Sequence, residues 1–276
     1  MAGWEPDGAG SRCERLLDAG WGSPFWRVVR KTRGMADLGS YGRSFADVYD
    51  AWYTDVSDVA ATVARARELS ADGRVLELGV GTGRLALPMS GVGLDVVGID
   101  ASVEMLDALR AKEGASRVHA VFGDMAELPF APAFSMVLVA FNTLFNLVGH
   151  DRIETCFAEV ARVLLPHGAF VVEAFVPPLP GEASDDGVSV REIRDDAVVL
   201  TAATRTHHDH LITGSHIEIG PTGIRLRPWR LCYATPPELD TFAAKAGLEL
   251  ATRHGGWHAE PYDRESTIHV SVYRKA

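Results

Sequence analysis

The sequence predicts an α/β fold: a seven-stranded, mostly parallel sheet that ends in an antiparallel hairpin, with an inserted antiparallel β lid. Three observations predict it. Short apolar runs alternate with amphipathic stretches as far as about residue 180, which is typical of a parallel sheet covered by helices on both faces. Longer strand-like segments with turn signals between them then indicate an antiparallel meander. A helical stretch and two final strand-like runs return the chain to the main sheet.

The elements follow in a regular order. Two helices are expected ahead of the sheet, over 45–53 and 56–69. Apolar runs predict five parallel strands, at Val75–Leu78, 94–99, 117–122, 135–141 and 169–175, and the helices between them are expected at 83–90, 103–112 and 151–165. The lid is expected to hold strands at 188–200, 211–219 and 224–233. A helix over 236–246 and strands at Leu248–His254 and 266–273 complete the prediction.

The chain divides into three predicted regions. Residues 1–40 form a partly ordered N-terminal extension, 41–180 with 235–276 form the core, and 181–234 form the lid. The extension holds Trp4, Trp21 and Trp26, which is many tryptophans for a solvated tail. Two interpretations stay open: a loosely ordered tail, or a segment that covers a pocket or a partner subunit, with a homodimer as the arrangement to test.

Composition narrows the classes of partner. The formal net charge is −10, and an acidic surface repels phosphate, so we expect neither nucleic-acid nor membrane binding. The three cysteines lie far apart and show no metal-ligand or redox spacing, which favours a reducing compartment. No basic-then-apolar leader and no spanning apolar run is visible, so a cytoplasmic location is expected.

A glycine-rich turn is the strongest local signal. The strand Val75–Leu78 runs into Gly79, Gly81 and Gly83 and then into a helix, so that a ligand can approach bare main chain and free N–H groups. A dinucleotide fingerprint needs a small residue where Arg84 stands. Glu77 would repel a pyrophosphate but suits the cationic amino end of S-adenosylmethionine. Asp100, after the second strand, can accept both ribose hydroxyls of either ligand and does not discriminate.

Four motifs carry a family resemblance: Glu77-Leu-Gly-Val-Gly-Thr-Gly83, Gly98-Ile-Asp100, Gly123-Asp124-Met125 and Leu165-Pro-His-Gly168. Their order and spacing resemble those of class I S-adenosylmethionine-dependent methyltransferases, over roughly residues 74–175. The resemblance implies a Rossmann-like fold, with S-adenosyl-L-methionine as cofactor and S-adenosyl-L-homocysteine as product. It also implies that the glycine turn holds the methionine part and that Asp100 and Ala101 hold the ribose. Met105 would pack on the adenine, with Asp124 and Met125 at its edge.

A narrower resemblance rests on Asp47-Val-Tyr-Asp-Ala-Trp-Tyr53, Phe141-Asn-Thr-Leu-Phe-Asn146, Val172-Glu-Ala-Phe175 and the antiparallel insert. Together these are similar to actinobacterial small-molecule methyltransferases that include the amino-sugar N,N-dimethyltransferases, and more distantly to glycine N-methyltransferase-like enzymes. The resemblance implies methyl transfer to an N, O or C atom of a small molecule, in secondary metabolism. The insert is not a close match to that of the sugar enzymes, so no particular substrate carries over.

Methyl transfer requires the acceptor atom to be held about 3 Å from the methyl carbon, and a base only if the acceptor is protonated. The candidate catalytic residues are Tyr49, Tyr53, Asn146 and His258. Tyr53 is also expected to close over the cofactor, which Phe141 and Asn142 would border. The two tyrosines stand one helical turn apart, so a role in packing the helix stays open beside the functional one. Glu173 likewise has two interpretations, a site for a cationic acceptor or a structural partner.

Other functions remain as alternatives. Cyclisation or rearrangement without methyl transfer would need the same cofactor motifs, whereas Glu77 and Arg84 disfavour a nucleotide-dependent oxidoreductase. A noncatalytic protein would not need an intact glycine turn. The lid favours small acceptors because an enclosed pocket hinders entry of a folded macromolecule. No metal site is predicted: His207-His208-Asp209-His210 is interpreted as a solvated turn, in which alternate side chains diverge.

Overall fold

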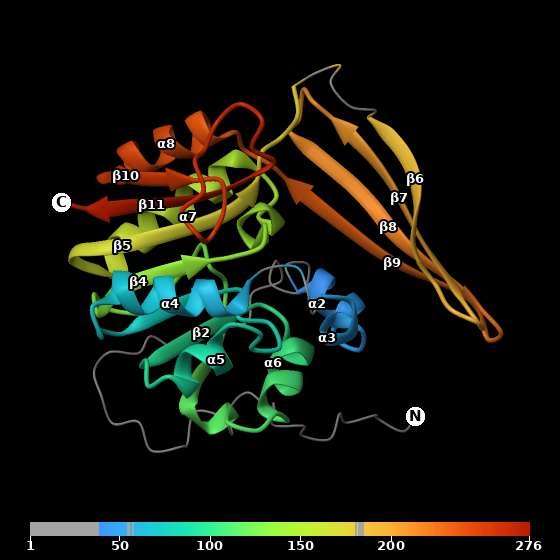
Figure 1. The fold of residues 1–276 in the computed structure, drawn as a ribbon, viewed down its shortest axis with the longest axis horizontal. Coiled ribbons are helices and arrows are strands. Elements are labelled where there is room, and N and C mark those ends of the chain that lie inside the picture. The colour runs from blue at the N-terminus through green and yellow to red at the C-terminus, as the bar shows by residue number, and fades with distance from the viewer. Residues whose placement is uncertain (1–38, 54–55, 57, 180, 182–184) are drawn as a thin grey trace, which may run out of the picture.

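The computed structural model describes residues 39–53, 56, 58–179, 181 and 185–276. The predicted extension 1–40, with its tryptophans, lies outside this part except for its last residues, 39 and 40. Seven strands form the main sheet in the order β10-β11-β5-β4-β1-β2-β3 (Figure 1). They are β1 (Val75–Leu78), β2 (Val96–Asp100), β3 (Val118–Phe122), β4 (Phe134–Val139), β5 (Leu164–Phe175), β10 (Leu248–His254) and β11 (Ile268–Lys275).

The predicted fold class is confirmed. Strand β1 pairs in parallel with β2 and β4, and its four residues are all buried. Strand β11 runs antiparallel to β5 on one side and to β10 on the other, which is the expected C-terminal hairpin. A strand at the centre of a parallel sheet is covered on both faces, which explains why these segments read as continuous apolar runs.

Helices cover both faces of this sheet and bury two apolar cores. One core joins the sheet to α7 (His150–Val163) and α8 (Pro236–Lys245), and the other joins it to α4 (Val59–Ser70), α5 (Ala86–Gly91) and α6 (Val103–Arg110). Single-turn 3-10 helices lie at Ala115–Arg117 (η2) and Thr143–Asn146 (η3). No helix in the described part of the chain is long and apolar enough to cross a membrane.

A second sheet is formed by the part of the chain that follows β5 and precedes α8. It is an antiparallel meander in the order β6-β7-β8-β9, formed by β6 (Asp186–Ile193), β7 (Val198–Thr206), β8 (Leu211–Gly220) and β9 (Gly223–Cys232). The prediction of one strand over 188–200 was wrong, because the chain reverses between Arg194 and Ala197, where the Arg194 amide donates to the Ala197 carbonyl at 2.8 Å. This turn contains no glycine or proline, and its only turn-favouring residues are Asp195 and Asp196, which the strand prediction did not take into account.

The single helix expected over 45–53 is also replaced by two shorter ones, α2 (Ser40–Phe45) and α3 (Tyr49–Trp52). Asp47 stands in the break between them, and its carboxylate pairs with Arg227 of β9 at 2.6 Å and with Arg225 at 2.7 Å. Arg191 of β6 donates to the Trp52 carbonyl at 2.8 Å. In Figure 1 the two helices lie between the second sheet and the core. The second sheet therefore holds α2 and α3 in place by ion pairs and hydrogen bonds.

Candidate active site

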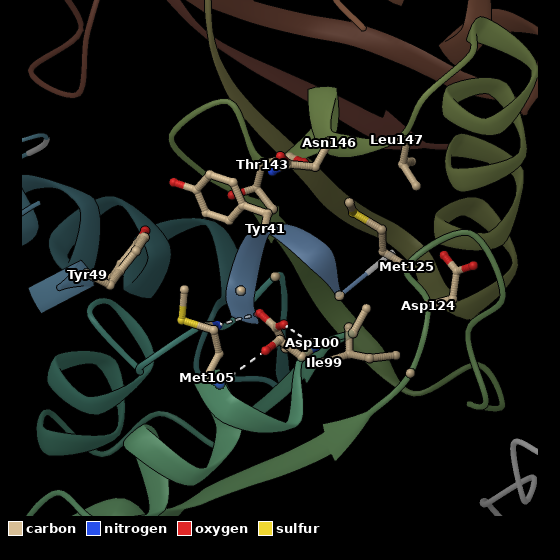
Figure 2. Close-up of a pocket in the computed structure, with 17 residues that line it drawn as sticks. Tyr41, Tyr49, Ile99, Asp100, Met105, Asp124, Met125, Thr143, Asn146 and Leu147 are labelled. Atoms are coloured by element: carbon tan, nitrogen blue, oxygen red, sulfur yellow. Dashed lines mark hydrogen bonds between the residues drawn. The ribbon is translucent and has the colours of Figure 1, made fainter. Parts of the chain in front are cut away.

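A pocket opens at the carboxyl ends of β1 and β2, beneath α2 and α3 (Figure 2). Ligands of open α/β sheets bind at this edge, where the connections to the following helices diverge. Its lining brings together nine residues that the sequence predicted: Tyr49, Gly79, Gly81, Asp100, Ala101, Met105, Asp124, Met125 and Asn146. They come from segments that are far apart in the chain, and the parallel sheet gathers them at one edge.

The three glycines of the turn have different tasks. All have positive φ angles, of 68° at Gly79, 54° at Gly81 and 83° at Gly83, a region that costs other residues about 1–2 kcal/mol. A Cβ atom at Gly79 would collide with the Thr143 side chain, whereas one at Gly81 would meet nothing closer than 3.9 Å. The backbone at Gly81 therefore faces open space that a ligand can fill. Gly83 does not line the pocket and instead allows close packing of the helix that follows.

Asp100 is positioned by the backbone around it. One carboxylate oxygen accepts from the Gly81 amide and the other from the Ser102 amide, both at 2.8 Å. Each oxygen keeps further acceptor capacity, and the residue borders the pocket, so both oxygens can receive the hydroxyls of a ribose. Burial raises the pKa of Asp100, and the amide hydrogen bonds act against that rise. A ligand that donates two hydrogen bonds would stabilise the charged carboxylate.

The far end of the pocket suits a flat base. Met105 is 3% exposed and lies in the first turns of α6, whose N-cap is Ser102. Across from it, Asp124 accepts from the Ala126 amide at 2.9 Å and pairs with the Arg152 guanidinium. Its fixed carboxylate can accept from an exocyclic amino group, and Met125 borders the same end (Figure 2).

Glu77, a predicted cofactor residue, is not among the residues that line the pocket, but it lies beside the glycine turn and tests whether a cationic amine fits next to that turn. It is 5% exposed, next to the glycine turn, and its Oε2 atom is buried without a hydrogen-bond partner. Burial raises the pKa of Glu77 to about 8, with Arg84 acting against the rise and Asp100 adding to it. An unpartnered buried carboxylate oxygen is costly, and an ammonium group would satisfy it. The residues present therefore fit the amino acid end of S-adenosylmethionine.

Helices α2 and α3 close the pocket from above. A Cβ atom at Gly39 would lie 2.6 Å from the Ala101 carbonyl, and one at Gly42 would overlap the Ser102 side chain. These contacts place α2 directly on the loop that holds the ribose site. Asp50 of α3 accepts from the Thr82 hydroxyl at 2.6 Å, which fastens α3 to the glycine turn.

Tyr41 and Tyr49 project from these helices and line the pocket, whereas Tyr53 does not. Tyr53 is buried behind Tyr49, with ring centroids 4.8 Å apart, and meets the Phe141 ring edge-on at 5.7 Å. Burial raises the pKa of Tyr41 well above its usual value, helped by Tyr53, and burial also raises the pKa of Tyr49 against the effect of Arg84. Both phenols therefore stay neutral at physiological pH. Sequence reasoning missed Tyr41, since it was assigned to no helix.

The loop after β4 forms the side of the pocket. Asn146 lines it and donates to the Thr143 carbonyl at 3.3 Å. Asn142 has a structural contact, because its side-chain oxygen accepts from the Phe175 amide at 2.7 Å. Phe141 does not line the pocket either. Both residues have positive φ angles, of 47° at Phe141 and 63° at Asn142, so the loop turns sharply at the strand end.

Glu173 fixes this loop. Its two oxygens accept from the Phe141 amide at 2.8 Å and from the Trp257 indole at 2.9 Å. Burial raises the pKa of Glu173, and both hydrogen bonds act against the rise. The geometry favours the structural interpretation of this residue over a site for a cationic acceptor.

His258 lies elsewhere, which corrects the expectation that it belongs to the pocket. Its Nε2 atom lies 2.9 Å from the carboxylate of Asp58 at the start of α4, and its side chain is 66% exposed. The loop that carries it is held against Asp58 by this contact, and the imidazole does not line the pocket. The contact between His258 and Asp58 could not be predicted from the sequence, because the two residues are 200 positions apart.

Comparison with known proteins agrees with this geometry. Residues 75–168 match the family described as a methyltransferase domain. The cypemycin N-terminal methyltransferase of a Streptomyces species is 30% identical over 235 residues, which cover 84% of this chain and 96% of the relative. The structure of the CcbJ methyltransferase from Streptomyces caelestis superposes with a TM-score of 0.82 at 39% identity, over 87% of this chain and 99% of that one.

A more distant structure shares the fold. S-adenosylmethionine-bound CalS10 from Micromonospora echinaspora, an amino pentose methyltransferase involved in calicheamicin biosynthesis, has a TM-score of 0.61 at 20% identity, over 91% of this chain and all of that one.

The chain therefore belongs to the S-adenosylmethionine-dependent methyltransferases, and S-adenosyl-L-methionine is its cofactor. When bound, the cofactor supplies a methyl group on a positively charged sulfur. The chain's residues divide the binding task. Asp100 would hold the ribose and Glu77 the amino group, while Met105 and Asp124 would hold the adenine. Tyr41, Tyr49 and Asn146 line the same pocket without a role in this division.

Proposed function

We propose that this enzyme methylates the nitrogen of an amine on a small molecule, in secondary metabolism. The observation that carries the proposal is the lining of the pocket beyond the cofactor residues. Among the described residues that line it, the only carboxylates are Asp100 and Asp124, which are held by backbone amides and by Arg152. The remaining polar side chains there are hydroxyls and one amide: Tyr41, Tyr49, Ser102, Thr143 and Asn146.

This lining favours an amine over an alcohol. A hydroxyl acceptor must lose its proton to a base as the methyl group arrives, and no described lining residue is suited to that task at neutral pH. An amine can enter the site already deprotonated, because its proton exchanges with water. Neutral phenol and amide groups can then orient its lone pair by hydrogen bonds, and the rings of Tyr41 and Tyr49 can stabilise the cation that forms.

The lid completes the argument for a small acceptor. Helices α2 and α3 contribute Tyr41, Gly42 and Tyr49 to the lining of the pocket, and the second sheet holds these helices in place, an arrangement that restricts access and excludes water during transfer. The names of the relatives support the same class of acceptor, since the cypemycin enzyme is an N-terminal methyltransferase and CalS10 acts on an amino pentose.

The test is a comparison of matched acceptors. The purified protein is incubated with methyl-labelled S-adenosyl-L-methionine and pairs of compounds that differ only in an amine or a hydroxyl, such as amino sugars, amino acids and short peptides with their hydroxy counterparts. We expect the label in the amine of at least one pair, and a rate that rises with pH through the pKa of that amine. Transfer to the hydroxyl members alone would contradict the proposal. Conversion of a test compound into a cyclised or rearranged product, without release of S-adenosyl-L-homocysteine, would favour the cyclisation alternative.

A further inference from the structure

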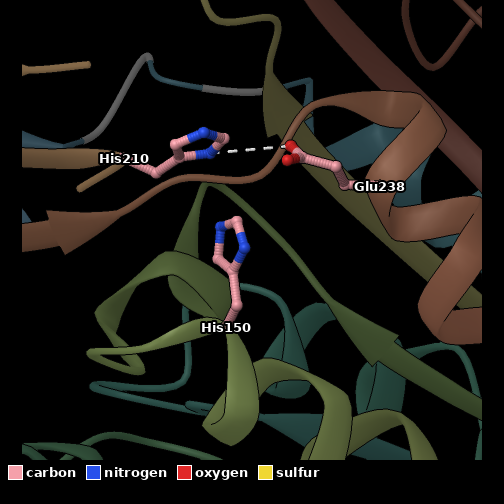
Figure 3. A group of neighbouring side chains, drawn as sticks. All are labelled: His150, His210 and Glu238. Carbon is pink, nitrogen blue, oxygen red and sulfur yellow. Dashed lines mark ion pairs between the residues drawn. The ribbon is translucent and has the colours of Figure 1, made fainter. Parts of the chain in front are cut away.

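His150, His210 and Glu238 meet where the second sheet joins the core (Figure 3). His210 belongs to the turn between β7 and β8, His150 begins α7, and Glu238 lies in the first turn of α8. One possible ligand atom from each residue lies within 4.8 Å of the others. All three side chains are half-buried, so the cluster can exchange water and ions with solvent.

His210 has an unused nitrogen that faces this cluster. Its Nδ1 atom lies 3.6 Å from the Glu238 carboxylate, is buried, and has no hydrogen-bond partner. The His150 ring meets the His210 ring edge-on, with centroids 4.7 Å apart. A buried polar atom without a partner costs about 1–3 kcal/mol, so such an atom calls for a ligand or a functional explanation. A metal ion that accepts the lone pair would supply the missing partner.

The neighbouring hydrogen bonds orient the other two side chains. The Nε2 atom of His150 lies 2.9 Å from the Tyr233 carbonyl, which can only accept, so Nε2 carries the proton and Nδ1 keeps a lone pair. The Oε2 atom of Glu238, which is the oxygen 3.6 Å from His210 Nδ1, accepts from the amide and the hydroxyl of Thr235, both at 2.7 Å, and the carboxylate keeps its second oxygen, Oε1, for an ion. Metal-binding histidines and carboxylates are usually held by such outer hydrogen bonds.

We propose that His150, His210 and Glu238 bind a divalent transition-metal ion, with zinc as the best match. Two imidazoles and one carboxylate form a ligand set typical of zinc, whereas magnesium and calcium prefer oxygen ligands alone. Tetrahedral bonds of about 2.1 Å place ligand atoms roughly 3.4 Å apart. The separation of 3.6 Å between His210 and Glu238 is already close to that value. A fourth position is left for water.

Such an ion would link the β7–β8 turn to the first turns of α7 and α8. Helix α7 follows η3, whose Asn146 lines the cofactor pocket, so the ion would fix the second sheet relative to that pocket. This inference opposes the sequence expectation of no metal. The turn 207–210 alone has diverging side chains, and only the fold adds His150 and Glu238 to it. The proposal does not depend on which acceptor is methylated.

Zinc titration of the untagged full-length protein, stripped with a chelator and free of cofactor, tests the proposal. Calorimetry is expected to find one ion per chain with a micromolar or tighter Kd. His210→Gln should weaken that binding by at least about tenfold. The matched control is His208→Gln, in the same turn but exposed and outside the cluster, and it should bind zinc as the wild type does.

A second measurement needs no variant. Cobalt added to the stripped wild type should give the visible absorption of a four-coordinate ion, and zinc should slow hydrogen exchange in residues 207–210. Absence of stoichiometric zinc binding would overturn the proposal, as would equal weakening by His208→Gln and His210→Gln. Because no cofactor or acceptor is present, these results are independent of the proposed N-methylation.

Discussion

Replacing Asp100 by asparagine tests the ribose site with little change in shape. In the wild type the carboxylate accepts from the Gly81 and Ser102 amides, and both of its oxygens can also receive ribose hydroxyls. Asparagine keeps one acceptor oxygen but places an NH₂ group where the other oxygen was. That group faces a backbone N–H donor and cannot accept from the ribose.

The expected loss of affinity follows from the hydrogen bonds removed. A hydrogen bond to a charged group contributes about 1.5–3 kcal/mol, and one such bond to the ribose is lost outright. Since about 1.4 kcal/mol corresponds to a factor of ten, S-adenosyl-L-homocysteine should bind roughly 10- to 100-fold more weakly. The variant should fold but be less stable, because one backbone amide loses its acceptor at a cost of about 1–3 kcal/mol, which removal of a buried charge partly offsets.

Calorimetric titration with S-adenosyl-L-homocysteine measures this loss, and thermal unfolding confirms that the variant is folded. Asp95→Asn is the matched control: Asp95 precedes β2, pairs with Arg74 at 2.7 Å on the surface, and does not line the pocket. The control should bind as the wild type does. A folded Asp100→Asn protein with a Kd within about twofold of the wild type would refute the assignment of the ribose site.

Three further predictions address other parts of the site. Gly81→Arg should weaken S-adenosyl-L-homocysteine binding at least about tenfold in the same titration, since φ is 54° at this position and the new side chain would fill the space beside the backbone. Unchanged affinity would refute the placement of the ligand at Gly81. Tyr49→Phe should lower kcat for methyl transfer without changing cofactor affinity, and it should lower kcat more than Tyr53→Phe does, because only Tyr49 of the two lines the pocket. Equal kcat values in the two variants would indicate that Tyr49 only packs the helix. Burial raises the pKa of Glu77 from 4.5 to about 8, so the stability that its neutral form provides is full below pH 4.5 and is lost as the pH rises through about 8. Glu77→Gln should therefore raise the free energy of unfolding, relative to the wild type, more at about pH 9 than at about pH 4, by on the order of a few kcal/mol in urea titrations; an equal effect at both pH values would contradict the burial argument.

The main sheet could be predicted because each of its strands can be recognised from its own residues. A buried strand such as Val75–Leu78 reads as an apolar run, and the glycines after it mark the turn. The reversal at Arg194–Ala197 was missed because no glycine or proline marks it, although Asp195 and Asp196 at its centre favour a turn. The break between α2 and α3 depends on Arg225 and Arg227, which reach Asp47 from the second sheet, and such long-range pairing leaves no trace in local sequence.

The cofactor side of the site was predictable for a similar reason. Asp100 ends β2, and Gly81 and Asp124 come within three residues of the ends of β1 and β3, so a parallel sheet must bring them to one edge. The acceptor side depends on how α2 and α3 fold back over that edge. Tyr41 was missed and His258 was misplaced, because their positions are set by tertiary contacts rather than by a strand end.

The most direct test of the account is a calorimetric titration of the full-length protein with S-adenosyl-L-homocysteine, with NAD as the control ligand. The account predicts one site per chain with a micromolar Kd for the first ligand and no binding of the second, because Glu77 beside the glycine turn would repel a pyrophosphate and Arg84 stands where a dinucleotide fingerprint needs a small residue. Binding of NAD, or no binding of S-adenosyl-L-homocysteine, would contradict the assignment of this pocket.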